Sequence, residues 1–270
     1  MNWHFALIGQ PVKHSRSPLI HQQYAQQFGH ELRFDLIECG PDEVAATVTD
    51  FFAAGGQGMN VTLPHKAVVL GCCASLSEEV GLAQAANTLV PTPEGLRGEN
   101  TDGRGLVNDL QRLGVALRDR RVLVIGAGGA ARGIIKPLLD QQPAELVWSN
   151  RNPLRLEGMD ELYRPHGRLR CCGNLTLKGD TFDVVIHASA AGHQGLVPLL
   201  PDGLFAPGAV AYDLSYGAAA RPFLDWASQW GATACHEGLG MLVEQAALSF
   251  QHWTGQLPET AAAHHLLAQG

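Results

Sequence analysis

Arg121–Gly133 reads RVLVIGAGGAARG, and this stretch decides the fold expected for the chain around it. The apolar residues Val122–Ile125 predict a short buried strand, and Ile134–Leu139 has apolar positions at helical spacing. A strand, a glycine turn and a helix in this order can hold a dinucleotide, with the pyrophosphate at the helix N-terminus. The stretch therefore predicts a nucleotide site, although similar glycine turns also join strands to helices in proteins without ligands. Three small residues in the turn fit the G-x-G-x-x-G/A spacing: Gly126, Gly128 and Ala131.

Composition sets the class of protein. A chain of 270 residues, 46% hydrophobic and 17% charged, is typical of a globular protein and long enough for two domains. The net charge of −7 and the absence of a basic run argue against nucleic acid or a membrane surface as a partner. No apolar run approaches membrane-spanning length, and no basic leader precedes an apolar stretch, so we expect neither a membrane span nor a signal peptide.

The six cysteines and twelve histidines do not predict a metal site. No C-x-x-C or H-E-x-x-H spacing occurs, and two of the cysteine pairs are adjacent in sequence. Adjacent cysteines suit neither zinc ligation nor disulfides, so we expect reduced thiols and a cytoplasmic protein.

Strands and helices alternate along the chain, which predicts an α/β fold with mostly parallel sheets. Ser17-Pro18 is expected to open a helix, with serine as the N-cap and proline at the first helical position. Pro91–Gly95 is expected to form a turn after a strand at Asn87–Val90. The remaining expected strands are at residues 4–8, 32–38, 59–62, 145–148, 182–186 and 209–214, and the other helices at 42–54, 77–86, from 100 onward, and 241–253.

The end of the second strand of the nucleotide domain indicates which cofactor binds. An NAD site has an acidic residue there, about 20 residues past the glycines, which bonds the ribose hydroxyl. Here the sequence is Ser149-Asn150-Arg151-Asn152, with Arg155 one turn later, so no carboxylate is present at this position. Arg151 and Arg155 can grip a 2′-phosphate, which favours NADP, although a loop with ordinary surface arginines would read the same way.

Lys66 and Asp102 are the candidate residues for proton transfer. Lys66 follows a predicted strand and a proline turn, and Asp102 lies in GENTDG at a helix start. A carboxylate beside a lysine can hold the ammonium in place to protonate a developing alkoxide. Taken singly, the lysine could be a solvated surface charge and the aspartate a helix cap.

The chain resembles the shikimate dehydrogenase family over nearly its whole length. The matching stretches occur in the family's order: GQPVKHSRSPLIH, GMNVTLPHK, AANTL, GENTDGRG, VIGAGGAARG, NR with Arg155, and GLGMLVEQAALSF. The resemblance implies NADP-dependent, reversible reduction of 3-dehydroshikimate to shikimate, in a monomer or a homodimer. It also implies a discontinuous substrate domain at residues 1–101 and 239–270, with a Rossmann domain at 102–238 and the active site in the cleft between them.

The resemblance further implies a role for individual residues, with Lys66 and Asp102 as the catalytic pair. The implied substrate contacts are Ser15, Ser17, Thr62, Lys66, Asn87, Asp102, Tyr216 and Gln245. The implied pyrophosphate loop is Gly126, Ala127, Gly128, Gly129 and Ala130, and the implied adenosine-phosphate contacts are Asn150, Arg151 and Arg155. The implied contacts around the rest of the cofactor are Ser189 and Leu214, with Gly238 and Met241 near the nicotinamide.

Several positions depart from the family pattern. His65 replaces an aromatic residue before the lysine, and Asn152 replaces a threonine in the adenosine-phosphate loop. His187–Gly192 reads HASAAG where the family has NATS-x-G, so histidine and serine replace asparagine and threonine. These changes keep open a related enzyme acting on quinate or another cyclohexane polyol. A non-catalytic NADP sensor is a third possibility, although such a protein is expected to have lost the lysine or the aspartate.

Overall fold

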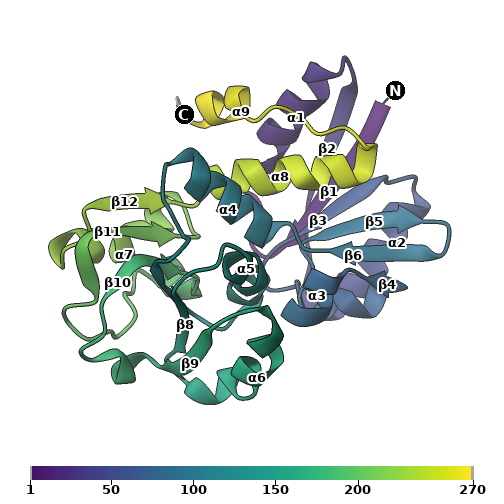
Figure 1. Ribbon diagram of the computed structural model, residues 1–270. Coiled ribbons are helices and arrows are strands. Elements are labelled where there is room, and N and C mark those ends of the chain that lie inside the picture. The colour runs from purple at the N-terminus through teal and green to yellow at the C-terminus, as the bar shows by residue number, and fades with distance from the viewer. Residues whose placement is uncertain (1, 269–270) are drawn as a thin grey trace. The chain divides into compact units, whose positions relative to one another are not determined.

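The computed structural model describes residues 2–268, which pack into two compact units. Unit 1 comprises Met1–Leu106 and Leu242–Gly270, and unit 2 comprises Val107–Met241. Figure 1 shows that each unit is built on its own sheet. Within residues 2–268, every helix is too short or too polar to cross a bilayer.

The sheet of unit 1 has six strands in the order β2-β1-β3-β5-β6-β4. β1 pairs in parallel with β2 and β3, and β4 pairs in parallel with β6, whereas β5 runs antiparallel to both of its neighbours. The carboxyl ends of β1, β3 and β6 and the amino end of β5 therefore meet at one edge of the sheet. The strands are β1 (Asn2–Gly9), β2 (Glu31–Glu38), β3 (Gly58–Val61), β4 (Ser75–Leu76), β5 (Thr88–Thr92) and β6 (Gly95–Glu99).

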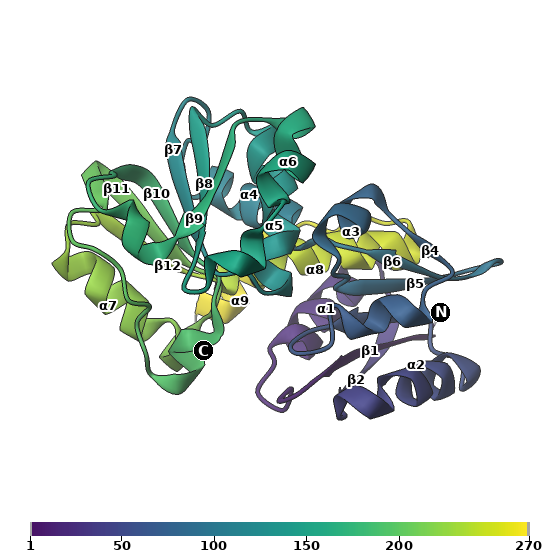
Figure 2. The same ribbon diagram turned by 90° about the horizontal axis from the view of Figure 1, so that it is seen from below.

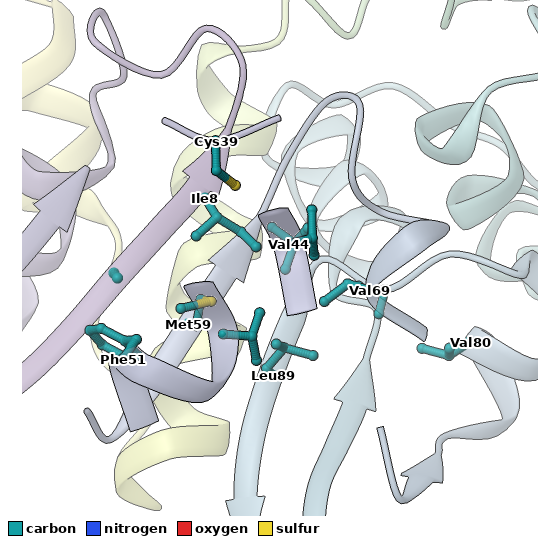
Figure 3. Close-up of a cluster of buried hydrophobic side chains, with 12 residues drawn as sticks. Ile8, Cys39, Val44, Phe51, Met59, Val69, Val80 and Leu89 are labelled. Carbon is teal, nitrogen blue, oxygen red and sulfur yellow. The ribbon is translucent and has the colours of Figure 1, made fainter. Parts of the chain in front are cut away.

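Helices cover both faces of this sheet because alternate residues of β1 point to opposite sides. Ile8 belongs to a buried cluster with α2 and α3 residues such as Val44 and Val80 (Figure 3), and Ala6 is part of the same cluster. Trp3 and Phe5 pack on the other face against α1, α8 and α9. Figure 2 shows α2 and α8 on opposite sides of the strands. The helices are α1 (Ser17–Gln27), α2 (Val44–Ala53), α3 (Glu78–Ala83), α8 (Leu239–Thr254) and α9 (Ala261–Ala268).

The sheet of unit 2 is entirely parallel, in the order β12-β11-β10-β7-β8-β9. The chain proceeds from β7 outward through β8 and β9, then returns to β10 on the other side of β7. The junction of β7 and β10 is therefore a topological switch point, where doubly wound sheets bind their ligands. The strands are β7 (Arg121–Ile125), β8 (Glu145–Asn150), β9 (Leu169–Gly173), β10 (Phe182–His187), β11 (Phe205–Asp213) and β12 (Ala234–Glu237).

The strands of unit 2 are buried by helices that follow them. α5 buries Ile134, Ile135, Leu138 and Leu139, and Ala131 is fully buried at its first turn. Phe223 and Ala227 of α7 pack with residues of β7, β10 and β11 in one cluster. The helices are α4 (Asp102–Arg112), whose last six residues belong to this unit, α5 (Gly129–Asp140), α6 (Met159–Tyr163) and α7 (Arg221–Gln229).

The expected α/β class with mainly parallel pairing is confirmed, and several local expectations are corrected. Ser17 does not cap α1: the N-cap is Arg16, and the Ser17 backbone N–H donates to the Ser15 hydroxyl at 3.2 Å. The turn expected at Pro91–Gly95 is shorter, since β5 runs through Thr92 and β6 begins at Gly95. β4, β6, β9, β12, α6, α7 and α9 had no predicted counterpart. Each of them is too short to show a clear periodic pattern.

Candidate active site and nucleotide site

Lys66 and Asp102 form a close ion pair in unit 1. The Lys66 Nζ donates to Asp102 Oδ2 at 2.5 Å, and the two side chains are 12% and 5% exposed. Lys66 follows β3 after a turn in which the His65 N–H donates to the Thr62 carbonyl. Asp102 follows β6 and begins α4, so the shared sheet edge brings together two residues far apart in sequence. A nearly buried ammonium on a buried carboxylate is a suitable group for moving a proton.

Asn87 joins this pair to the sheet. Its amide Nδ2 lies within hydrogen-bond distance of Asp102 Oδ1, at 2.9 Å, and of Thr101 Oγ1, at 2.8 Å. Its Oδ1 accepts from the Thr101 backbone N–H and from the Thr88 hydroxyl, both at 2.9 Å. The two Asp102 oxygens thus receive different donors, Lys66 on one and Asn87 on the other. This arrangement fixes the carboxylate plane and with it the ammonium.

Gln245 reaches the same cluster from α8. Asn87 Nδ2 lies 3.1 Å from Gln245 Oε1, and Gln245 Nε2 donates to the Leu242 carbonyl at 2.9 Å. α8 lies close to α4 here, because a Cβ on Gly105 would lie 2.6 Å from the Gln245 Cβ. The structure therefore brings together four of the predicted site residues: Lys66, Asn87, Asp102 and Gln245.

The remaining predicted substrate contacts of unit 1 lie in loops that follow β1 and β3. The Ser15 hydroxyl donates to the Ser17 hydroxyl at 3.1 Å. Thr62 is partly exposed beside β1, and its methyl would lie 2.4 Å from a Cβ on Gly9. The two loops are tied together by the Gln10 N–H, which donates to the Leu63 carbonyl at 2.8 Å. No hydrogen bond among residues 2–268 links Ser15, Ser17 or Thr62 to the Lys66 pair through a side chain.

His65 points into the core of unit 1 and is fully buried. Its Nε2 lies 2.8 Å from the Cys39 carbonyl oxygen and 3.7 Å from the Cys39 sulfur. The ring therefore donates to a backbone carbonyl in an apolar cluster. These contacts fit a packing residue that takes the place of the family's aromatic side chain.

The glycine loop of unit 2 has the geometry expected for a dinucleotide turn. Gly126 has a φ of 127°, and a Cβ there would lie 2.6 Å from the Ala188 carbonyl oxygen, so only glycine fits. Gly128 is the N-cap of α5, and a Cβ there would meet nothing within 4 Å. Gly129 and Ala130 open the helix, whose first turn has no acidic side chain, and Ala127 is buried before it. The N-terminus of α5 therefore has open space above it and no carboxylate that would repel an anion. Its free N–H groups can bind a pyrophosphate.

The loop after β8 presents two unpaired guanidinium groups. Arg151 and Arg155 are exposed, and neither forms an ion pair within residues 2–268. Asn150 Nδ2 donates to the Asn152 carbonyl at 2.9 Å, and Asn152 Oδ1 accepts from the Leu154 N–H, so the loop is held by its own hydrogen bonds. Two cations on an ordered turn beside the glycine loop fit a 2′-phosphate.

The other predicted cofactor contacts lie at the carboxyl ends of β10, β11 and β12. Ser189 follows β10 and Leu214 follows β11, and the Leu214 N–H donates to the His187 carbonyl at 2.9 Å. A Cβ on Gly238 would lie 2.2 Å from the Leu214 carbonyl oxygen, so this position requires glycine. Tyr216 lies in unit 2 as the N-cap of a short 3₁₀ helix at residues 217–219.

Met241 is held at the end of unit 2 by a buried tyrosine. The Met241 N–H donates to Tyr212 Oη at 3.2 Å, and that hydroxyl donates to Asp109 Oδ2 at 2.7 Å. Burial and the nearby Asp109 carboxylate raise the pKa of Tyr212, so its hydroxyl stays protonated and both bonds persist. Among the described residues, no cluster of histidine, cysteine or carboxylate side chains is arranged to hold a metal.

The sequence did not single out a second layer of polar groups behind the site of unit 1. Ser249 Oγ lies 2.7 Å from Thr88 Oγ1 and 3.2 Å from Thr101 Oγ1, and it accepts from Asn60 Nδ2 at 3.1 Å. All of these side chains are buried. The available signal was spacing, because Ser249 lies four residues after Gln245 and therefore on the same face of α8.

Comparison with known proteins matches both ends of the chain to one family. Residues 7–89 match the family described as "Shikimate dehydrogenase substrate binding domain". Residues 238–267 match the "Shikimate 5'-dehydrogenase C-terminal domain". The chain is 46% identical over 257 residues to the protein named shikimate dehydrogenase (NADP(+)) of Nitrosospira multiformis, covering 95% of this chain and 94% of that protein.

Two solved structures extend the similarity to the whole fold. An Ael1 enzyme from Pseudomonas putida is similar with a TM-score of 0.89 and 40% identity, covering 98% of both chains. The shikimate 5-dehydrogenase of Thermus thermophilus, solved in complex with NADP(H) and shikimate, has a TM-score of 0.86 and 29% identity, covering 99% of both chains. Sequence identity at this level over nearly the full length leads to one conclusion. The chain belongs to the shikimate dehydrogenase family.

Proposed function

We propose that this protein is an NADP-dependent oxidoreductase that reversibly reduces 3-dehydroshikimate to shikimate, in the pathway to aromatic amino acids. The observation that carries the proposal is the nearly buried Lys66–Asp102 pair held by Asn87. A nearly buried ion pair is costly to desolvate, and a protein that only binds NADP has no use for this one, so the pair favours an enzyme over a sensor. The family membership supplies the reaction.

We assign unit 1 to the substrate and unit 2 to the cofactor. The Lys66 ammonium protonates the oxygen that develops negative charge as the carbonyl is reduced, and it takes the proton back in the reverse direction. Asp102 holds the ammonium in position and Asn87 holds Asp102, so the donor is oriented before the substrate binds. Ser15, Ser17, Thr62 and Gln245 supply hydrogen bonds to the substrate, and Tyr216 is assigned to the same substrate.

NADP, when bound, supplies or accepts the hydride. Gly126, Ala127, Gly128, Gly129 and Ala130 hold its pyrophosphate, and Asn150, Arg151 and Arg155 hold the adenosine phosphate. Ser189, Leu214, Gly238 and Met241 line the remainder of its site. The open N-terminus of α5 and the unpaired arginines support this assignment.

The thiols and the composition bear on where the enzyme works. All six cysteines are free thiols, as is usual for a protein in a reducing compartment, so we place the enzyme in the cytoplasm. The family resemblance further suggests a monomer or a homodimer.

Isotope transfer tests the proposed reaction directly. The purified protein is incubated with 3-dehydroshikimate and NADPH carrying deuterium at the transferable position, and the product is identified by mass spectrometry. The proposal expects shikimate that carries one deuterium, formed much faster with NADPH than with NADH. An unlabelled product, or no product from a folded protein, would contradict it. Lys136→Met, which removes a lysine paired with Asp140 outside the proposed site, is the control variant and should form the same labelled product at the wild-type rate.

A further inference from the structure

A hydrogen-bonded relay of three side chains lies at the carboxyl ends of β10 and β11. Asp213 Oδ2 lies 2.7 Å from His187 Nδ1, and His187 Nε2 lies 2.6 Å from the Ser189 hydroxyl. Asp213 and His187 are completely buried, whereas Ser189 is partly exposed. The relay therefore leads from the core of unit 2 to one hydroxyl at its surface.

The place of Ser189 follows from the glycine loop. A Cβ on Gly126 would lie 2.6 Å from the Ala188 carbonyl oxygen and 3.1 Å from the Ser189 nitrogen, so the chain after β10 packs directly on the first glycine. β10 and β8 flank β7 on opposite sides. A dinucleotide binds across this switch point, so an adenosine half over β8 leaves the nicotinamide half on the β10 side, where Ser189 lies.

The direction of each bond follows from which nitrogen of the His187 ring carries the proton. The buried Asp213 carboxylate accepts from His187 Nδ1 and, through Oδ1, from the Ser215 N–H at 2.8 Å. In the tautomer that carries its one ring proton on Nδ1, Nε2 is only an acceptor, and the Ser189 hydroxyl then donates its hydrogen to the ring. The Phe223 ring packs on the imidazole at 4.8 Å and holds its orientation. The Ser189 oxygen also accepts weakly from the Ala191 N–H at 3.4 Å, and it keeps acceptor capacity toward solvent.

We propose that His187 and Asp213 are positioning residues that fix the Ser189 hydroxyl as a hydrogen-bond acceptor for the nicotinamide half of the cofactor. The ligand group is an N–H or O–H donor, either the carboxamide or a ribose hydroxyl. The inference deepens the proposed function and rests on it, because it requires NADP to bind in unit 2. It also gives a physical role to the histidine and serine that replace asparagine and threonine in this family's pattern.

The test uses isothermal titration calorimetry to compare the affinity for NADPH with the affinity for adenosine 2′,5′-bisphosphate, which represents only the adenosine half of the cofactor. Ser189→Ala and His187→Phe are each expected to weaken NADPH binding about 3- to 10-fold, the equivalent of one hydrogen bond. Both variants are expected to bind adenosine 2′,5′-bisphosphate, which lacks the nicotinamide half, as tightly as the wild type. Ser189→Thr, which retains the hydroxyl, restores NADPH binding, and Ser228→Ala, at an exposed serine of α7, changes neither ligand.

Two further measurements separate the possible outcomes. Nitrogen NMR of the His187 ring is expected to show a proton on Nδ1 and none on Nε2. An NADP analogue with an acetyl group in place of the carboxamide identifies the donor: if it is the carboxamide, Ser189→Ala no longer weakens binding of the analogue, and if it is the ribose, the loss persists.

Three results would overturn the relay: unchanged NADPH affinity in both variants, equal weakening of NADPH and of adenosine 2′,5′-bisphosphate binding, or a proton on Nε2, whether or not Nδ1 also carries one. A wild-type protein that binds no NADPH would instead reject the proposed cofactor.

Discussion

Replacing Lys66 by methionine tests the part of the site on which the mechanism depends. The substitution keeps most of the apolar stem and removes the ammonium that contacts Asp102 at 2.5 Å. Because the proton donor is lost while the groups around it remain, kcat should fall about 10²- to 10⁴-fold with a KM for shikimate within a few-fold of the wild type.

The same substitution should lower stability, because it leaves a nearly buried carboxylate without its counterion. Removing one partner of a buried pair typically costs about 3–5 kcal/mol. Asp102 is 5% exposed and keeps the Asn87 bond at 2.9 Å, so we expect the lower end, about 3 kcal/mol. Urea unfolding monitored by circular dichroism measures this loss, and it should shrink when Asp102→Asn is added.

A double-mutant cycle decides whether the two residues act as one unit. If they do, Lys66→Met and Asp102→Asn each reduce kcat severely, and the double variant is scarcely slower than Lys66→Met alone. Turnover within a few-fold of the wild type in Lys66→Met would refute the mechanism. Strictly multiplicative losses in the double variant would refute the coupling while leaving each residue a separate role. Lys136→Met should match the wild type in rate.

Three further outcomes follow from other parts of the structure. Arg151→Ser should raise the KM for NADPH about 10- to 100-fold, which corresponds to the loss of one charge-assisted hydrogen bond, and should leave the KM for NADH unchanged. Equal effects on the two KM values would mean that the arginine does not contact the phosphate. His65→Phe should leave the pH–rate profile unchanged and cost about 1–3 kcal/mol in urea unfolding, because the Cys39 carbonyl loses its donor; a shifted profile would return His65 to the active site. Burial lowers the pKa of His21 from 6.5 to about 3, so the unfolded chain binds a proton that the folded chain excludes, and stability falls as the pH drops below 6.5. The loss attributable to His21 between pH 7 and pH 5 is about 2 kcal/mol, and His21→Phe should remove that part; an identical pH dependence in the variant would show that His21 does not titrate as proposed.

The segment from β7 to α5 was the most predictable part of the fold because its signal is local. The β7 strand, the glycines and α5 are contiguous in sequence, and the positive φ of Gly126 is a requirement that the glycine itself reveals. The strand at Asn87–Val90 was predicted, but the second strand of the hairpin, β6, was missed. β6 reads GLRGE, with two glycines and two charges, and gains its strand conformation from pairing with β5.

The clustering in the candidate site could not be deduced from spacing. Lys66, Asn87 and Asp102 meet because β3, β5 and β6 bring their ends to one edge, an arrangement that depends on β5 being antiparallel. The family resemblance identified these residues, but not the hydrogen-bond chain that joins them. The role of Asp213 could not be predicted, because a carboxylate at a strand end is usually solvated and only the fold brings His187 beside it.

Steady-state oxidation of shikimate and quinate, each with NADP⁺ and NAD⁺, measures the substrate and cofactor preference of the enzyme together. The two substrates differ by a ring hydroxyl and a double bond, and the two cofactors by the 2′-phosphate that Arg151 and Arg155 are proposed to bind. We expect the highest kcat/KM for shikimate with NADP⁺, exceeding both shikimate with NAD⁺ and quinate with NADP⁺. A higher kcat/KM for quinate, or no oxidation of shikimate with either cofactor by a folded protein that binds NADPH, would contradict it.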